Sequence, residues 1–325
     1  MSTIAQDIRD QNFQKVYLIY GEEKYLALQY KRELVRALLP EGDTMNFTRF
    51  AGKDTDPAEV IGLCETLPFF ADRRVILLED TLFFKNKCDE LADYMKNLPD
   101  TVCLVFSEDQ VDKRSRMYKA VKAAGSITEC VSPDEKKLMQ WAGALLKKNG
   151  RRISARDCAY LLEKTGTDMG TLRTELEKLI SYTEGRDVVT AADMDAVCTT
   201  AVSSHIFDMV RAVAEKNQKK AMELYQELLA LKEPPMRILF LLAKQFRQLA
   251  QIKAMEQEGR GQGEIQKILG LPGFAVRQSS ACARAYTGEK LQEALTDFTD
   301  FEEAVKTGNL SDRLSVEMLI IKYSA

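Results

Sequence analysis

Hydrophobic and polar positions follow two different patterns along the chain. Up to about residue 131, short apolar runs rich in β-branched and aromatic residues alternate with longer segments whose apolar positions recur every three or four residues. The first pattern is typical of buried strands and the second of amphipathic helices. Strands are predicted at 16–20, 46–50, 74–78, 101–106 and 127–131. Helices are predicted at 22–38, 56–66, 86–98 and 113–124. Strands joined through helices imply right-handed crossovers and a mainly parallel sheet covered on both faces.

The pattern changes at Ser132-Pro133-Asp134-Glu135. Ser132 with Glu135 three residues later predicts a capping box, with Pro133 at the first helical position. No strand is predicted beyond this point. Helices follow at 133–149, 154–165, 168–183 and 190–198, and then at 203–215, 218–231, 235–258, 262–269, 272–286, 289–306 and 311–323. We therefore predict an α/β domain over 1–132, a small helical domain over 133–201 and a helical bundle over 202–325.

One connection, Leu67 to Arg73, carries two adjacent phenylalanines. Pro68 fixes its own φ and lacks a backbone N–H, so the preceding helix is expected to end there. The apolar run 75–78 then begins the next strand. Because connections run over the surface, Phe69 and Phe70 either cap the core of their own domain or enter the pocket of a partner protein.

Composition and charge narrow the class of protein. With 45% hydrophobic and 29% charged residues the chain has an ordinary soluble globular composition. The net charge of −3 gives no global attraction to nucleic acid or to an anionic membrane. Residues 1–10 show no apolar signal core, and the longest apolar stretch, 238–243, is too short to span a bilayer. The seven cysteines are scattered singly, which is typical of reduced, buried thiols in a cytoplasmic protein.

The turn after Tyr20 is where a phosphate-binding loop would lie in a sheet of this kind. Such a loop needs a second glycine followed by lysine, and Gly21 stands alone. Glu22 and Glu23 instead place two carboxylates at the helix N-terminus, where they would repel a triphosphate. No nucleotide or other cofactor is therefore predicted. The alternative is a working ATPase with an atypical phosphate site around Gly21 and Lys24.

Other candidate chemistry is sparse. Glu79-Asp80 follows the third strand like the acidic end of a Walker B strand, and without a phosphate loop we interpret it as a remnant or a solvated turn rather than a Mg²⁺ site. His205, the one histidine, is interpreted as a helix-start or packing residue. The basic segment 113–122 is interpreted as a solvated face, or else as a partner or DNA contact. No catalytic residue and no metal site is predicted.

Five stretches in this order carry a family resemblance: 16–26, 67–74, 111–114, 166–179 and 306–319. On these residues the chain resembles the delta subunits of the bacterial DNA polymerase III clamp loader over essentially its whole length. The resemblance implies an AAA+-like α/β domain that lacks ATP binding, a helical lid domain and a helical collar domain. It also implies that the collar assembles with the delta prime and gamma/tau subunits of the complex.

The resemblance gives the apolar connection a role. In this family an apolar pair at this place enters a hydrophobic pocket of the sliding clamp, the beta subunit, and helps to open the ring for loading onto primed DNA. Leu67, Phe69 and Phe70 are the expected clamp-binding residues. Residues 65–70 resemble the clamp-binding pattern of glutamine, spacer, leucine, spacer, leucine and phenylalanine. Glu65 stands where glutamine is usual and lacks its amide donor, whereas Phe69 stands where leucine is usual and keeps the apolar volume.

Three hypotheses follow from the sequence. The first is a non-catalytic binding subunit of a DNA-directed DNA polymerase holoenzyme. The second is an active ATPase of the same fold. The third is a helical adaptor unrelated to replication, for which a purified clamp would show no interaction.

Overall fold

The computed structural model describes residues 4–324, so residues 1–3 and 325, at the ends of the first and last predicted domains, lie outside it. The chain divides into two compact units between Ser132 and Pro133. This division falls where the hydrophobic pattern changes. The first unit holds the predicted α/β domain, and the second holds all the predicted helices that follow it.

The first unit is built on a five-stranded sheet. Its strands are β1 (Val16–Tyr20), β2 (Phe47–Ala51), β3 (Arg74–Glu79), β4 (Val102–Glu108) and β5 (Ser126–Glu129). Their order across the sheet is β2-β3-β4-β1-β5, and every neighbouring pair is parallel. The predicted parallel sheet is confirmed. Because all strands point the same way, their carboxyl ends share one edge, here called the carboxyl edge, and their amino ends share the opposite, amino edge.

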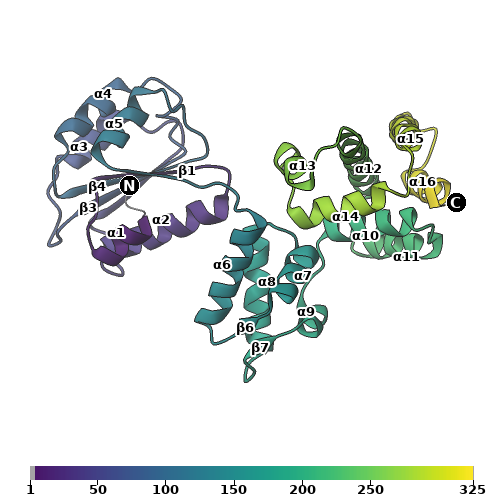
Figure 1. Ribbon diagram of the computed structural model, residues 1–325. Helices are drawn as coiled ribbons and strands as arrows, with labels where there is room; N and C mark the ends of the chain where they lie inside the picture. Colours follow the sequence, from purple (N-terminus) through teal and green to yellow (C-terminus); the bar gives the residue numbers. More distant parts are fainter. Residues whose placement is uncertain (1–3, 325) are drawn as a thin grey trace. The chain divides into compact units, whose positions relative to one another are not determined.

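Helices cover both faces of this sheet, as predicted (Figure 1). They are α1 (Ile4–Asp10), α2 (Lys24–Leu38), α3 (Pro57–Cys64), α4 (Asp89–Tyr94), the 3₁₀ helix η1 (Met95–Asn97) and α5 (Arg116–Ala124). Alternate side chains of β1 point to opposite faces: Val16 and Leu18 pack with α3, α4 and α5, whereas Tyr17 and Ile19 pack with α1 and α2. The predicted helix 86–98 is shorter than expected. The helix predicted from residue 113 begins at Arg116, because Ser115 is its N-cap.

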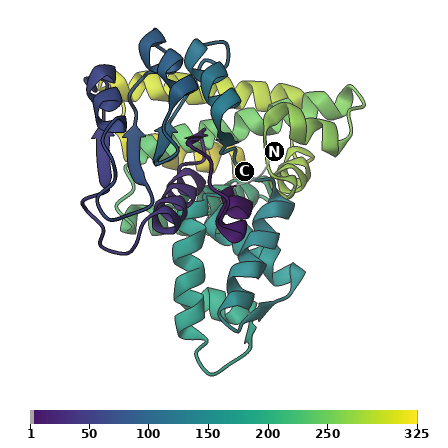
Figure 2. The same cartoon turned by 90° about the vertical axis from the view of Figure 1, so that its left-hand side faces the viewer.

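The first part of the second unit contains α6 (Glu135–Lys148), α7 (Ala155–Thr165), α8 (Met169–Tyr182) and α9 (Ala191–Val197), whose teal ribbons lie together in Figure 2. Two predictions for this part are wrong. Two-residue strands, β6 (Arg152–Ile153) and β7 (Val188–Val189), form a small parallel sheet where none was expected. The N-cap of α6 is Asp134, whose carboxylate accepts the Lys137 N–H at 2.8 Å, so the expected Ser132 capping box does not form.

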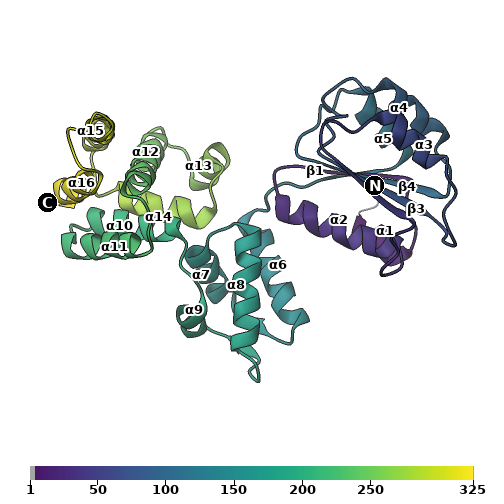
Figure 3. The same ribbon diagram turned by 180° about the vertical axis from the view of Figure 1, so that it is seen from behind.

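The remaining helices form the predicted bundle. They are α10 (Val202–Ala214), α11 (Gln218–Ala230), α12 (Pro235–Gln257), α13 (Gln262–Leu269), α14 (Gly273–Ala283), α15 (Gly288–Lys306) and α16 (Asp312–Ser324). The long helix α12 is central, since α10, α14, α15 and α16 all pack against it (Figure 3). Within residues 4–324, none of the helices is both long and apolar enough to cross a membrane.

All seven cysteines are buried and free, as the sequence predicts. Burial raises the pKa of every one of these thiols, to about 12 for Cys64, Cys103 and Cys198 and to about 11 for Cys130, Cys158 and Cys282. These thiols are therefore protonated at neutral pH and poorly nucleophilic.

Candidate functional site

Residues 65–73, here called the plug loop, connect α3 to β3 at the amino edge of the sheet. The loop exposes its apolar side chains: Leu67 is 79% exposed, Phe69 56% and Phe70 96%. The two rings meet edge to face with their centroids 4.7 Å apart. The alternative in which both rings cap the core of their own domain is therefore wrong. An apolar group this exposed on a sheet edge is typical of a protein-binding surface.

The backbone of the plug loop is held from outside the loop. Asn46, which immediately precedes β2, is only 2% exposed, and its side-chain Oδ1 accepts the Phe69 N–H at 2.6 Å. Its Nδ2 donates to the Phe69 carbonyl at 2.9 Å and to the Asp43 carboxylate at 2.8 Å. Arg74 Nη2 donates to the Leu67 carbonyl at 3.1 Å.

Asn46 and Arg74 were missed as site residues in the sequence. The only local signal is an aspartate three residues before Asn46, a spacing that indicates a side-chain-bonded turn. Asp43 accepts the backbone N–H groups of Met45 and Asn46, each at 3.0 Å, which makes that turn. Hydrogen bonds from Asn46 hold the pKa of Asp43 below its ordinary value, so its carboxylate stays a charged acceptor.

The carboxyl edge has a different character at the turn after Tyr20. Gly21 has φ +136°, and a β-carbon there would lie 2.2 Å from the Cys130 carbonyl oxygen. The Glu23 N–H donates to that same oxygen at 3.1 Å, and the Glu23 carboxylate accepts the Tyr25 N–H at 3.0 Å. Backbone N–H groups at such a helix start face phosphates in a phosphate loop. Here two such N–H groups, those of Glu23 and Tyr25, donate to other groups of the chain.

Glu79 ends β3 at the same edge and is buried. Its two carboxylate oxygens accept hydrogen bonds from Lys31 and from Arg49. Burial alone would raise the pKa of Glu79, but these two cations outweigh it and hold the pKa below its ordinary value. The interpretation of Glu79 as part of a solvated turn is wrong, although Asp80 is exposed. Among residues 4–324, no group of three or more histidine, cysteine and acidic residues could hold a metal ion.

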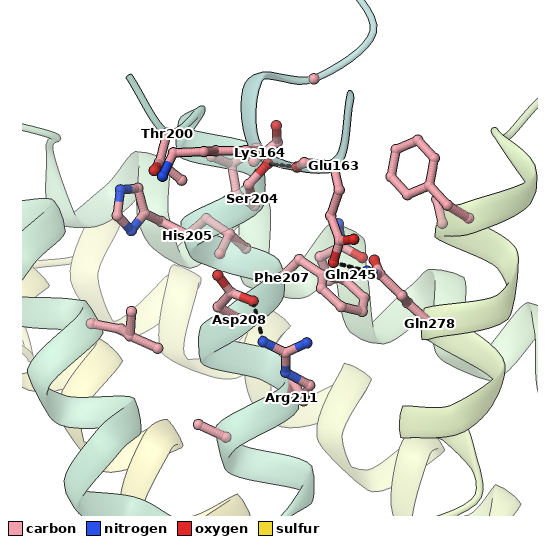
Figure 4. Close-up of a pocket in the computed structure, with 18 of the residues that line it drawn as sticks. Glu163, Lys164, Thr200, Ser204, His205, Phe207, Asp208, Arg211, Gln245 and Gln278 are labelled. Atoms are coloured by element: carbon pink, nitrogen blue, oxygen red, sulfur yellow. Dashed lines mark hydrogen bonds and ion pairs between the residues drawn. The ribbon is translucent and has the colours of Figure 1, made fainter. Parts of the chain in front are cut away.

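A cavity of about 750 Å³ lies in the second unit, where α7 meets α10, α12 and α14 (Figure 4). Several of its charged groups are bonded to other protein groups: Arg211 donates to Asp208 at 2.6 Å, and Gln278 donates to Glu163. His205 lines this cavity in the first turn of α10. Its Nδ1 is 3.8 Å from the Glu227 carboxylate, too far for a hydrogen bond. This arrangement presents no nucleophile with an aligned base.

The basic segment 113–122 is largely paired with acidic side chains. Lys113 contacts Glu129 at 2.8 Å, and Arg116 contacts Asp89 at 3.2 Å and Asp93 at 2.9 Å. Each pair is exposed to solvent and contributes little to stability. The local positive charge is nevertheless partly neutralised, which favours the solvated-face interpretation over a DNA contact.

Comparisons with known proteins give the same family for the N-terminal and the C-terminal parts of the chain. Residues 17–131 match the family described as "DNA polymerase III, delta subunit", and residues 203–323 match "DNA polymerase III delta subunit, C-terminal domain". The DNA polymerase III subunit delta of Bacillus subtilis is 23% identical over 320 residues, covering 94% of this chain and 92% of that relative. The probable DNA polymerase III subunit delta of Aquifex aeolicus is 21% identical over 271 residues, covering 79% of this chain and 76% of that relative.

A solved structure shares the fold. It is described as Bacillus subtilis DNA clamp loader delta protein (YqeN), and it matches with a TM-score of 0.71 at 20% identity, covering 99% of this chain and 98% of that one. The two family matches together span well over half of the chain, in the order expected for one protein. The chain therefore belongs to the DNA polymerase III delta subunit family.

Proposed function

We propose that this chain is the clamp-binding subunit of a DNA polymerase III clamp loader, and that Leu67, Phe69 and Phe70 enter a hydrophobic pocket of the sliding clamp. The observation that carries the proposal is the exposure of these three side chains at one edge of the sheet. Burying each ring in a partner would contribute about 1.5–3 kcal/mol by area. Together the rings are large enough to form the hot spot of an interface.

The test removes both rings and measures binding to the sliding clamp of the same organism by calorimetry. We expect Phe69→Ala with Phe70→Ala to weaken binding by several kcal/mol, roughly a hundredfold or more, while the chain stays folded. Phe240→Ala is the matched control, since Phe240 is also an exposed phenylalanine but lies on α12. Unchanged affinity in the double variant would refute the assignment of the plug loop.

We propose further that the chain itself is non-catalytic and binds no ATP, acting as one subunit of the polymerase holoenzyme. The support is the carboxyl edge, where the Glu23 N–H is bonded to Cys130 and Glu79 is bonded to Lys31 and Arg49. Equilibrium dialysis with labelled ATP tests this proposal on the isolated chain. Saturable binding would instead favour the atypical ATPase.

The bundle is the proposed site of assembly with the delta prime and gamma/tau subunits. Helix α16 supports this proposal because it buries Val316, Leu319 and Ile320 while exposing a second stripe, formed by Leu314, Met318 and Ile321. A helix apolar on two faces commonly packs against a second partner. Changing the exposed stripe to serine is expected to reduce co-purification with the other subunits, and Leu231→Ser, an exposed change outside α16, serves as the control.

The place of action follows from the same proposal. A replication subunit acts in the cytoplasm, and the seven unpaired, buried cysteines suit a reducing compartment. Primed DNA is reached through the assembled complex, because the net charge of −3 gives this chain little attraction of its own for DNA.

A further inference from the structure

We propose that Asn46 is a positioning residue that holds the plug loop in its binding shape before the partner arrives. Its buried side-chain amide is hydrogen-bonded to both the N–H and the carbonyl of Phe69. These two bonds fix the direction in which the Phe69 and Phe70 side chains project from the sheet. This inference rests on the proposed function, because it assigns a role in the same contact.

The hydrogen bonds leave Asn46 one orientation. Its Oδ1 accepts the Phe69 N–H, while its Nδ2 uses one hydrogen for the Phe69 carbonyl and the other for Asp43. Reversing the amide would set two donors against each other at the Phe69 N–H and two acceptors against each other at Asp43. The carboxylate of Asp43 thus selects the rotamer that Phe69 requires.

Asn46 is itself fixed to the sheet. It lies at the start of β2, and its carbonyl accepts the Val75 N–H of β3 at 2.8 Å. Its backbone therefore joins the strand that follows the plug loop, and its side chain joins the loop itself. The position of Phe69 relative to the sheet is set by this double attachment.

The plug loop depends on hydrogen bonds from residues outside it to keep its conformation. Phe70 has φ +48°, in the left-handed region that side chains other than glycine disfavour. Its exposed ring gains nothing from burial in its own domain that would offset this cost. The Leu67 carbonyl and both Phe69 backbone groups find their partners in Arg74 and Asn46, outside the exposed tip. A free peptide of the same sequence has neither partner.

A loop that already has its bound conformation loses less conformational entropy when it binds, and this raises the affinity. We therefore expect the whole chain to bind the sliding clamp about tenfold or more tighter than a synthetic peptide spanning residues 64–72. The peptide carries the same three apolar side chains but lacks the bonds from Asn46 and Arg74, so the difference in affinity includes the effect of these bonds. Equal affinity of peptide and chain would overturn the inference.

The key variant is Asn46→Ala in the full chain. It is expected to lower clamp affinity about tenfold in a calorimetric titration at a temperature where melting curves show the chain folded. Asn86→Ala, at an exposed asparagine of the same unit, is the matched control. Wild-type affinity in Asn46→Ala would refute the inference, even if the variant melts at a lower temperature.

The isosteric variant Asn46→Asp sharpens the test. It keeps an acceptor for the Phe69 N–H but loses both donors and places a second carboxylate against Asp43, so we expect a loss at least as large as that of Asn46→Ala. If either variant fails to fold, Asp43→Ala replaces it, because Asp43 orients the Asn46 amide and bonds the turn before it, whereas the hydrogen bonds to Phe69 come from Asn46. A loss of about threefold is expected there, and no loss would count against the inference.

Amide hydrogen exchange distinguishes a positioning role of Asn46 from a general contribution to stability. In folded Asn46→Ala, the Phe69 amide is expected to exchange at least about tenfold faster, while amides within β3 keep their protection. Uniformly faster exchange across the sheet would show a general destabilisation and overturn the positioning role. If Phe69→Ala with Phe70→Ala binds normally, the proposed function fails instead, so the two failures are distinguishable.

Discussion

The two edges of the sheet in the first unit are built in opposite ways. At the carboxyl edge, polar and charged groups face inward to one another: the Glu23 N–H meets the Cys130 carbonyl, and Glu79 meets Lys31 and Arg49. At the amino edge, backbone groups are bonded inward while Leu67, Phe69 and Phe70 are left in solvent. Parallel sheets usually bind ligands at their carboxyl edge. In this chain Glu23 and Glu79 at that edge are bonded to other protein groups.

The comparison teaches that one parallel sheet can present two unlike edges, one with its polar groups bonded to each other and one with apolar side chains in solvent. Both edges belong to one sheet with the strand order β2-β3-β4-β1-β5, so the difference between them lies in the side chains and turns at each edge. Each edge can be tested by itself, because no side chain named at one edge contacts one named at the other.

The tight turn at the carboxyl edge is expected to tolerate no side chain. Gly21→Ala would combine a positive φ with a β-carbon 2.2 Å from the Cys130 carbonyl oxygen, so we expect a loss of about 3 kcal/mol in the free energy of unfolding, measured in urea. Gly42→Ala is the matched control, since Gly42 also has a positive φ but open space around it. A loss of about 1 kcal/mol is expected there. Equal losses in the two variants would contradict the close contact.

The ion pairs of Glu79 are expected to stabilise this edge. Lys31→Met leaves the largely buried Glu79 with only the exposed Arg49, so we expect a loss of about 1–2 kcal/mol at neutral pH. The control is Lys24→Met, which breaks an exposed pair with Asp109 and is expected to cost less than about 0.5 kcal/mol.

The same pairs predict a pH dependence with a definite sign. The pKa of Glu79 is lowered from its ordinary 4.5, so its contribution is fully present above that pH and is lost as the pH falls through the lower folded value. The stability difference between wild type and Lys31→Met should therefore shrink on acidification below 4.5. A difference that grows in acid would contradict this origin.

At the amino edge the smallest stability change is expected. Phe70→Ala should alter the free energy of unfolding by less than about 0.5 kcal/mol, because its ring is 96% exposed. Phe106→Ala, which removes a fully buried ring from β4, should cost about 3–5 kcal/mol. Thermal or urea unfolding of both variants measures the contrast. A large loss in Phe70→Ala would mean that the ring supports its own domain.

Much of the fold could be predicted because its elements carry long periodic signals. The strands of the first unit and the helices of the second lie within a few residues of their expected bounds. The pair β6 and β7 could not be found, since two residues show no alternation. The start of α6 was misplaced because Ser132 and Asp134 are both good N-caps, and only the local backbone decides between them.

The apolar members of the candidate site were visible in the sequence, but their support was not. Leu67, Phe69 and Phe70 are conspicuous beside a proline. Asn46 acts on Phe69 across 23 residues of chain, a contact that only the register of β2 beside β3 creates. The partners of Glu79 likewise come from α2 and β2, so pattern alone left it as a remnant or a turn.

The enclosed thiols of this chain have a practical consequence. All seven native cysteines are buried, and burial raises the pKa of thiols such as Cys64 and Cys103 to about 12. A maleimide dye at neutral pH should therefore react with a single cysteine introduced at an exposed position, such as Asp72, without removal of the native ones. Fluorescence from that one label could follow the approach of a ring-shaped partner in real time.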